Sequence, residues 1–364
     1  MKILFIANHL NVGGISSYLF TLASGLKDKG HNVYVVSSGG VWVDKFEKAG
    51  IKHIQAPLKT KSEVSLKIIF SFLKLNTQVK KLGIDLLQTN SRTTLVLGSL
   101  LSRYQKVAHV FTCHGFFKPK LSRKIFPCWP ETVIAISSQV KEHLVYDFKL
   151  SEKKINVINN GIDASCFGDF SGRKKSRQAL GINDDFLVGI IARLSDVKGH
   201  LYLLQAMQIV IKSFPLAKLL IVGEGKMRLR LVQEVDALGI KQNVLFLPEA
   251  ENTEDLLAAM DIFVMPSLQE GLGLALMEAM AQGLAVVGSA VGGIKALIQD
   301  EVNGLLVQPA DAKSLSEAII KLLSDSKLRQ DLGKNARKFI TDNFSQTKMV
   351  DATERVYKKC LKMV

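Results

Sequence analysis

At 364 residues, with 47% hydrophobic and 22% charged residues, the chain is long enough for two domains and has the composition of a globular protein rather than a disordered or fibrous one. No apolar run approaches the ~20 residues that span a bilayer, and the N-terminal run has no signal-peptide cleavage site, so we expect neither feature. The four cysteines have no paired or metal-type spacing, which is typical of the reducing cytosol.

Positive charge is concentrated in the first half of the chain. Residues 1–160 contain 23 Lys and Arg against 9 Asp and Glu, a net charge of +14, whereas residues 161–364 contain 25 against 24, a net charge of +1. We therefore expect the first half to face an anionic partner, such as a membrane surface, an acidic glycolipid or a nucleic acid. Nucleic acid is disfavoured because no nucleic-acid-binding motif accompanies the charge. The alternative is charge that serves solubility alone.

Short apolar segments alternate with helix-like segments along the whole chain, which predicts parallel sheets in Rossmann-like layers. In the first half we expect strands at 2–8, 31–38, 52–57, 84–90, 106–114 and 132–137, and helices at 16–29 and 64–82. In the second half we expect strands at 186–193, 217–225, 243–249, 261–267, 284–290 and 303–309. The segment 164–186 is rich in Gly, Ser and charge and is predicted to be a linker.

This alternation predicts an α/β protein with two doubly wound domains that face a central cleft. We place the first domain at residues 1–165 and the second at 166–344. The last segment, 345–364, is predicted to be a helix that packs back on the first domain. Ligands of such sheets bind beyond the carboxyl ends of the strands, so candidate site residues should lie in loops that follow strands.

The first such loop contains Gly13 and Gly14, which follow the first strand and open a helix. Backbone N–H groups and the helix dipole can bind a phosphate at that position. The pattern is not G-x-G-x-x-G, and Ser37 and Ser38 stand where a cofactor ribose would require an acid, so a nicotinamide enzyme is disfavoured. The alternative is a glycine turn without a ligand.

Two cations and two acids follow strands of the second half. Arg193 ends a predicted strand and Lys198 lies five residues later, so the two side chains can clamp a diphosphate. Glu270 is predicted in a loop and Glu278 within the next helix, where carboxylates can accept hydrogen bonds from sugar hydroxyl groups. The alternatives are solvated surface cations, a helix-capping glutamate and a solvated helix glutamate.

A series of motifs occurs in the order seen in one enzyme family. These are NVGGISSYLFTLASGLKDKGHNVYVV, TCHG, VINNGID, IARLSDVKG, VGEG, PSLQEGLGLALMEAMAQGLAVVGSAVGG and NGLLVQPAD. On these motifs the chain resembles glycosyltransferase family 4, whose members are retaining enzymes with the GT-B fold. The resemblance covers essentially the whole chain and is strongest over residues 186–320. It implies that the first domain binds the acceptor and the second binds a nucleotide sugar.

The resemblance also implies roles for individual residues. Arg193 and Lys198 would neutralise the departing nucleoside diphosphate. Glu278 would bind the ribose hydroxyl groups, Glu270 would contact the transferred sugar, and His114 would lie near that sugar, although a structural histidine is the alternative. The implied catalytic residues are His114, Glu270, Arg193 and Lys198. The implied donor-binding residues are Gly13, Gly14, Arg193, Lys198, Gly223, Glu270, Gly271, Gly273, Leu274 and Glu278.

The sequence departs from the family pattern near the sugar. Leu272 stands where the family usually has Phe, and the glycine pair at 292–293 is not followed by the usual Pro and Glu. The donor sugar is therefore left open, with UDP- or GDP-linked hexoses expected. The implied reaction is front-face attack, in which the leaving diphosphate helps to deprotonate the acceptor hydroxyl. No Asp-x-Asp motif occurs, so we expect neither a bound metal ion nor a cofactor.

Two basic and apolar segments bear on the acceptor and the location. Residues 64–82 suit an interface with anionic lipid, but an ordinary sheet-packing helix is the alternative. Residues 116–130 place four aromatic side chains among four basic ones and favour a membrane or glycolipid surface. The aromatic residues are Phe116, Phe117, Phe126 and Trp129, and the basic ones are Lys118, Lys120, Arg123 and Lys124.

We therefore expect a cytoplasmic enzyme, peripheral at the inner face of the membrane, that extends a lipopolysaccharide core, a capsule or another envelope glycan. Two alternatives stay open. One is a sugar-nucleotide epimerase of the same fold, and the other is a non-catalytic relative that binds glycan or lipid. The combination of Arg193 and Lys198 with Glu270 and Glu278 favours the transferase over both.

Overall fold

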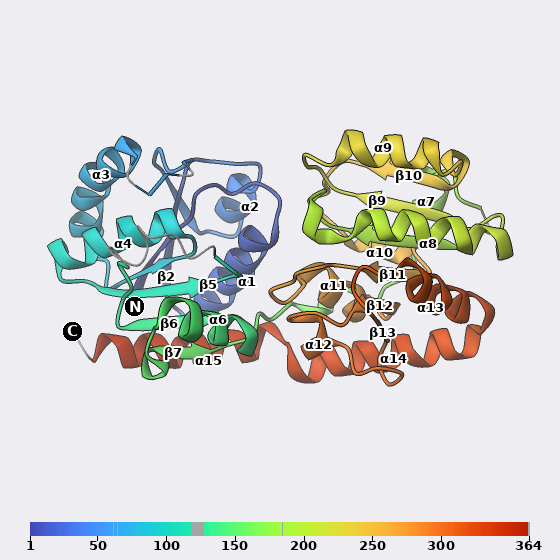
Figure 1. Cartoon of the computed structure of the whole chain (residues 1–364). Coiled ribbons are helices and arrows are strands. Elements are labelled where there is room, and N and C mark those ends of the chain that lie inside the picture. Colours follow the sequence, from blue (N-terminus) through green and yellow to red (C-terminus); the bar gives the residue numbers. More distant parts are fainter. Residues whose placement is uncertain (61, 64, 118–126, 184, 363–364) are drawn as a thin grey trace. The chain divides into compact units, whose positions relative to one another are not determined.

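A computed structural model describes residues 1–60, 62–63, 65–117, 127–183 and 185–362. The chain divides into two compact units. Unit 1 comprises Met1–Gly161 and Gln346–Val364, and unit 2 comprises Ile162–Ser345. The first boundary lies four residues before the one predicted from sequence, and the second lies one residue after it. Figure 1 shows the elements of each unit in chain order.

Unit 1 is built on a parallel sheet with the strand order β3-β2-β1-β4-β5-β6-β7. The central strands are buried on both faces, as expected where helices cover both sides of a parallel sheet. The strands of unit 1 are β1 (Lys2–Ile6), β2 (Asn32–Ser37), β3 (Lys52–Gln55), β4 (Leu86–Thr89), β5 (Ala108–Cys113), β6 (Thr132–Ala135) and β7 (Ile155–Val157). The six predicted strands of the first half are thus confirmed, whereas β7 was not predicted.

The helices of unit 1 are α1 (Gly14–Asp28), α2 (Val43–Lys48), α3 (Leu66–Leu82), α4 (Arg92–Gln105), α6 (Ser138–Phe148) and α15 (Gln346–Leu361). Although α15 comes last in the chain, it packs against α1 and β5. Its side chains Met349, Val350, Tyr357 and Cys360 belong to the same core cluster as Leu19 and Leu22 of α1. The C-terminal segment is therefore an integral part of the core of unit 1.

Unit 2 contains a second parallel sheet, with the strand order β10-β9-β8-β11-β12-β13. Its strands are β8 (Leu187–Ile191), β9 (Lys218–Val222), β10 (Val244–Leu247), β11 (Ile262–Met265), β12 (Ala285–Ser289) and β13 (Leu305–Val307). All six were predicted from their apolar runs. The strand order reverses direction between the two central strands, β8 and β11. The carboxyl ends of these two strands are therefore the topological switch point of the sheet.

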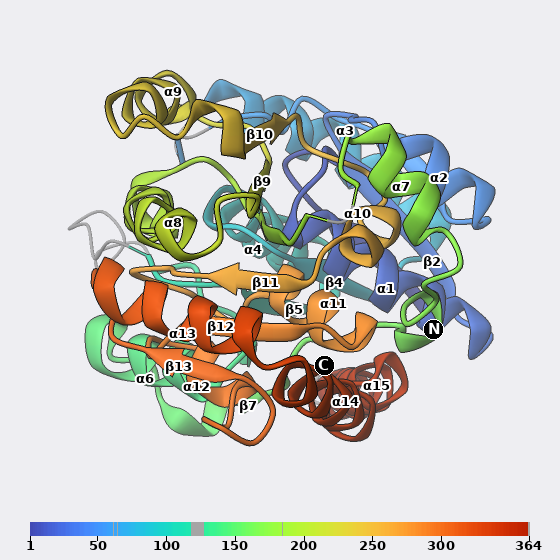
Figure 2. The same ribbon diagram turned by 90° about the vertical axis from the view of Figure 1, so that its right-hand side faces the viewer.

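Helices cover the two faces of this sheet, as Figure 2 shows for α8 and α13 on one side and α10 and α11 on the other. The helices are α7 (Arg173–Ala179), α8 (His200–Ser213), α9 (Arg228–Ala237), α10 (Glu254–Ala259), α11 (Leu274–Gln282), α12 (Ile294–Leu297), α13 (Ala312–Ser324) and α14 (Ser326–Asn343). Apolar side chains of α8, α9 and α13 join those of the sheet in one core cluster. Two parallel-sheet α/β domains are thus confirmed.

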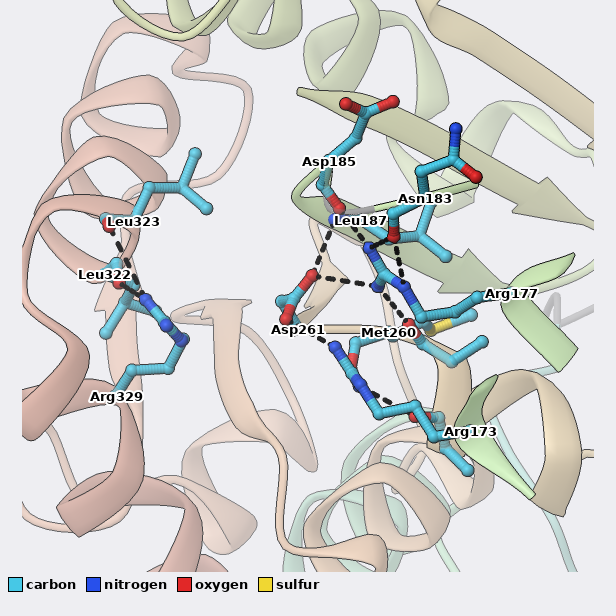
Figure 3. Close-up of polar contacts among 12 residues, drawn as sticks. Arg173, Arg177, Asn183, Asp185, Leu187, Met260, Asp261, Leu322, Leu323 and Arg329 are labelled. Carbon is cyan, nitrogen blue, oxygen red and sulfur yellow. Dashed lines mark hydrogen bonds and ion pairs between the residues drawn. The ribbon is translucent and has the colours of Figure 1, made fainter. Parts of the chain in front are cut away.

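The predicted linker at 164–186 is wrong, because the segment contains a helix that is anchored to the sheet of unit 2. It contains α7, whose side chains Arg173 and Arg177 converge on Asp261, just before β11 (Figure 3). Asp261 lies 2.6 Å from Arg173 Nη2 and 3.3 Å from Arg177 Nη1, and it also accepts a hydrogen bond from the Leu187 N–H at 2.8 Å. This network holds the amino ends of β8 and β11 together, at the opposite end from the loops that follow these strands.

Within the described residues, no helix is both long and apolar enough to cross a membrane. The same part of the chain contains no group of three or more His, Cys, Asp and Glu arranged to hold a metal ion. All four cysteines are free thiols.

Acid should destabilise unit 1 through His109 in β5. The ring is buried and bonded to Thr89 Oγ1 at 2.8 Å, and burial lowers its pKa to about 3. In the unfolded chain the His109 ring binds a proton near pH 6.5. The contribution of this histidine to the free energy of unfolding is therefore fully present above that pH and is lost as the pH falls towards 3. Between pH 7.5 and 4.5 this histidine should account for about 2–3 kcal/mol of lost unfolding free energy.

The measurement is urea unfolding of the wild type and of His109→Gln at both pH values. The variant should lose less stability on acidification than the wild type, because glutamine does not titrate. An identical loss in the two proteins would show that His109 does not control the acid sensitivity.

Candidate functional site

The loops that follow β8 and β11 meet at the switch point of unit 2. The Leu268 N–H donates a hydrogen bond to the Val197 carbonyl oxygen at 2.8 Å, which joins the two loops. Ligands of open parallel sheets bind at this position, because loops diverge there to opposite faces. The cations and the first acid predicted from sequence lie on these two loops.

Lys198 and Glu270 form an ion pair across the two loops. Lys198 Nζ lies 2.5 Å from Glu270 Oε2, and the side chains are 22% and 11% exposed, so solvent screens this pair less than a surface pair. The Gly271 N–H donates to Glu270 Oε1 at 3.2 Å, and Ser267 Oγ lies 3.4 Å from Oε2. Glu270 is therefore oriented by three groups, and it in turn fixes the ammonium group of Lys198.

The backbone of Glu270 is held from a third loop. The Gly293 N–H donates to the Glu270 carbonyl oxygen at 3.1 Å. Gly292 and Gly293 are not followed by the residues usual in the family. This pair nevertheless has a structural role beside Glu270.

The helix α11 begins directly beside this ion pair. Gly273 is its N-terminal cap, with φ 93°, and Leu274 is its first residue. The first turn contains no acidic side chain, so its N–H groups present partial positive charge without a local counter-charge. Further along α11, Glu278 Oε2 accepts a hydrogen bond from Thr253 Oγ1 at 3.0 Å, which positions its carboxylate.

Arg193 lies two residues beyond β8 and is exposed. In the part of the chain that the structure describes, no carboxylate forms an ion pair with it. Gly223, predicted to bind the donor, follows β9 with φ 145° and packs against the same loop, since a Cβ there would lie 2.1 Å from the Ala192 carbonyl oxygen. The structure thus gives Gly223 a packing role in holding the loop that carries Arg193.

Unit 1 places two predicted features at the carboxyl ends of its own strands. Gly13 caps α1 and Gly14 is its first residue, so the pair opens a helix after β1 as predicted. The first turn of α1 contains no acidic residue, and a Cβ on Gly13 would meet nothing within 4 Å. The amino end of this helix therefore has the charge and the space that a phosphate needs.

His114 follows β5 and is held in one tautomer. Its Nε2 lies 3.2 Å from Asn90 Oδ1, and because a carboxamide oxygen only accepts, Nε2 carries the proton and Nδ1 is an acceptor. Gln88 Nε2 donates to the same Asn90 oxygen at 3.2 Å, and the Tyr357 hydroxyl donates to Gln88. Burial lowers the pKa of His114 to about 3, so the ring is neutral at pH 7.

The structure thus brings some of the predicted residues together and adds others. Lys198 and Glu270 are in contact, and Gly271, Gly273 and Leu274 lie beside them. The sequence did not reveal the side chains that position the predicted site residues. Each positioning side chain is either distant in the chain from the residue that it holds or belongs to no distinctive motif. These positioning side chains are Gln88, Asn90, Thr253, Ser267 and Tyr357.

A glycine at 199 is required by close packing between the two loops. Gly199 has φ 72°, and a Cβ there would lie 1.8 Å from the Pro266 carbonyl oxygen. Gly239 has nearly the same φ, 69°, but a Cβ there would meet nothing within 4 Å. We expect Gly239→Ala to cost about 1–2 kcal/mol from backbone strain alone. We expect Gly199→Ala to cost at least about 2 kcal/mol more, because the loops must separate.

Urea unfolding of the two variants measures this difference directly. Since the backbone strain is matched, the difference reports the contact between the loops that follow β8 and β11. Equal destabilisation would contradict the close packing of these loops.

Comparisons with known proteins agree with this geometry. The model of the family described as "Glycosyl transferases group 1" matches residues 172–339, and that of "Glycosyltransferase Family 4" matches residues 12–165. An uncharacterized glycosyltransferase of Methanocaldococcus jannaschii is 29% identical and the alignment covers 97% of this chain and 96% of the relative. The UDP-Gal:alpha-D-GlcNAc-diphosphoundecaprenol alpha-1,3-galactosyltransferase of Escherichia coli is 29% identical over 80% of each chain.

The fold has close counterparts among solved structures. The crystal structure of HepE from Anabaena matches with a TM-score of 0.88 at 24% identity, covering 99% of this chain and 100% of that one. The two family models together match most of both units, and the fold matches along nearly the whole chain. This chain therefore belongs to the family 4 glycosyltransferases and has their GT-B fold.

Proposed function

We propose that the enzyme transfers a hexose from a nucleoside-diphosphate sugar to a hydroxyl group of a lipid-linked glycan, with retention of the anomeric configuration. The observation that carries the proposal is the Lys198–Glu270 ion pair beside the amino end of α11. A fixed cation and a helix N-terminus at one site suit an anionic leaving group. The carboxylate between them suits the hydroxyl groups of the sugar.

In the proposed reaction, most of the negative charge that develops in the transition state lies on the leaving diphosphate. The bond between the anomeric carbon and the diphosphate oxygen breaks, and a bond to the acceptor oxygen forms on the same face of the sugar. The acceptor proton passes to a diphosphate oxygen, so no protein nucleophile is needed. Lys198 and Arg193 would stabilise the departing diphosphate, and each such interaction is worth on the order of 10²–10³ in rate.

The same electrostatic argument leads us to propose that transfer needs no divalent metal ion. The positive charges of Arg193 and Lys198 and the first turn of α11 would supply the charge stabilisation that a metal otherwise supplies. Glu278, held by Thr253, would bind the ribose hydroxyl groups of the donor. Activity retained in excess EDTA is the expected result.

In unit 1, the amino end of α1 at Gly13 and Gly14 would bind the donor diphosphate, and His114 would bind a sugar hydroxyl. The tautomer of His114 supports this role, since its Nδ1 can accept a hydrogen bond from a hydroxyl group at neutral pH.

The E. coli relative supports the choice of donor and acceptor classes. Its name gives UDP-galactose as donor and a diphosphoundecaprenol-linked sugar as acceptor. We propose UDP as the first base to test and an isoprenoid diphosphate-linked sugar as the first acceptor. Such an acceptor lies in the membrane, so we place the reaction at its cytoplasmic face, in the assembly of an envelope glycan such as lipopolysaccharide or capsule.

The test has two stages. A thermal-shift panel of UDP- and GDP-hexoses identifies the donor, and an assay with an isoprenoid diphosphate-linked N-acetylglucosamine follows release of the nucleotide and formation of a disaccharide. NMR coupling constants of the product give the anomeric configuration, and an α-linked product from an α-linked donor is expected.

The alternatives give different results in the same assay. An epimerase would convert the donor sugar without any acceptor. A non-catalytic binding protein would bind without releasing nucleotide. Either result, or an inverted product, would contradict the proposal.

A further inference from the structure

The helix α3 exposes a row of large apolar side chains. Leu66, Ile69, Phe70 and Leu73 are 69%, 53%, 63% and 60% exposed. Their spacing of i, i+3, i+4 and i+7 places them on one side of the helix, and we call this row the α3 stripe. Contiguous exposed apolar surface of this kind typically marks an interaction site.

The stripe is not needed to hold α3 on the sheet. The opposite side of the helix is buried through Ile68, Leu75 and Val79, which belong to a core cluster with strand residues such as Leu4 and Leu87. The helix therefore packs on the sheet, as one of the two sequence interpretations expected. The lipid interface was the other interpretation, and the exposed stripe on the same helix leaves a surface for it as well.

The neighbouring helix α4 extends the exposed apolar surface. Leu100 and Tyr104 of α4 are 44% and 68% exposed, and the Tyr104 ring contacts the Phe72 ring of α3 at 5.8 Å between centroids. Figure 1 shows the two helices side by side in unit 1. A tyrosine at the edge of an apolar surface is typical of side chains that lie at a lipid–water boundary.

Basic residues surround this apolar surface. Residues 66–106 contain seven Lys and Arg, of which six are exposed and Arg92 is buried, and a single acid, Asp85. Lys67, Lys74 and Lys81 are exposed along the flank of α3 between the stripe and the buried side. Apolar side chains flanked by lysines on one helix are the pattern of helices that lie in the interface of an anionic bilayer.

We propose that the exposed surface of α3 and α4 docks on an anionic lipid bilayer. The occupant is argued from charge: a second copy of this chain, related by two-fold symmetry, would bring the same lysines face to face without compensating acids. A bilayer of anionic lipid complements the lysines and accepts the stripe. This surface is independent of the transfer reaction and does not include residues 118–126, which lie outside the described residues.

The first experiment tests the apolar contribution by co-sedimentation of the full chain with vesicles, without donor or acceptor. Vesicles of phosphatidylglycerol and phosphatidylcholine should bind the protein, and vesicles of phosphatidylcholine alone should bind it much less. Phe70→Gln with Leu73→Gln should lower the partition coefficient by about tenfold or more. The matched control is Leu229→Gln with Val232→Gln, also exposed and three residues apart on α9 of unit 2, which should leave binding unchanged.

The second experiment tests the charge contribution. Lys74→Gln with Lys81→Gln should lower the partition coefficient by about tenfold and weaken its dependence on salt. The control is Lys327→Gln with Lys334→Gln, which removes two exposed lysines at the same seven-residue spacing from α14. Circular dichroism of all four variants separates loss of binding from loss of fold.

Three outcomes would overturn the proposal: no binding of the wild type to anionic vesicles, equal losses in the test and control variants, or dissociation of a wild-type dimer by the stripe variant without any vesicle binding. The last outcome would assign the surface to a second copy. The co-sedimentation contains no substrate, so its result does not depend on transfer. A protein that binds anionic vesicles but is inactive in the transferase assay would count against the proposed function and not against this surface.

Discussion

Replacing Lys198 by alanine should lower kcat by about 10²–10³-fold, with a smaller change in KM. The ammonium group is fixed by Glu270 in a partly buried pair, so in the proposed mechanism its charge would act on the leaving diphosphate with little screening. The negative charge of the diphosphate increases in the transition state. Loss of the Lys198 ammonium group should therefore reduce turnover more than donor binding. Steady-state kinetics with a UDP-sugar and a saturating acceptor give the two parameters separately.

Lys226 provides a matched control for this variant. It forms an ion pair with Asp196 of the same loop at 2.6 Å, but its side chain is 73% exposed. Lys226→Ala removes the same charge from the same region and should leave kcat within about twofold, as expected for a screened surface pair. Equal losses in the two variants would indicate a general electrostatic effect and would sink the specific role of Lys198.

Replacing Glu278 by alanine should weaken donor binding by about 10–100-fold and leave kcat nearly unchanged. A carboxylate that binds two ribose hydroxyl groups contributes equally to the ground state and the transition state, so its loss appears in the dissociation constant. Isothermal titration calorimetry with the donor identified by the thermal-shift panel measures the change.

Two further variants show whether position or charge is responsible. Thr253→Val removes the hydroxyl that holds Glu278 at 3.0 Å and should weaken binding less than Glu278→Ala. Glu317→Ala removes an exposed helix carboxylate of α13 and should not change binding. A loss of turnover with unchanged affinity in Glu278→Ala would place this residue at the reacting sugar instead of the ribose.

The strands were predictable because parallel sheets bury both faces and so require short, uninterrupted apolar runs. The exception, β7, is a three-residue strand at the edge of its sheet, and a run that short carries no periodicity. The error at 164–186 has a different cause. Helix α7 is seven residues long and depends on Arg173 and Arg177 reaching Asp261, more than 80 residues further along the chain.

The candidate site shows the same limit. Lys198 and Glu270 could both be named from their motifs, but their contact joins residues 72 positions apart and is a property of the strand order. The tautomer of His114 depends on Asn90, which ends a predicted strand and carries no motif. The residues proposed to bind the donor thus belong to motifs that can be recognised in the sequence, whereas the residues that position them do not.

The packing of α15 in unit 1 has a consequence for synthesis on the ribosome. Unit 1 is encoded in two pieces, and unit 2 lies entirely between them in the chain. Until residues 346–361 emerge, the face of α1 around Leu22 lacks its partner Val350, and Gln88 lacks the Tyr357 hydroxyl. Unit 2 can therefore complete its core during translation, while unit 1 has to wait with an exposed apolar face until the last helix is made.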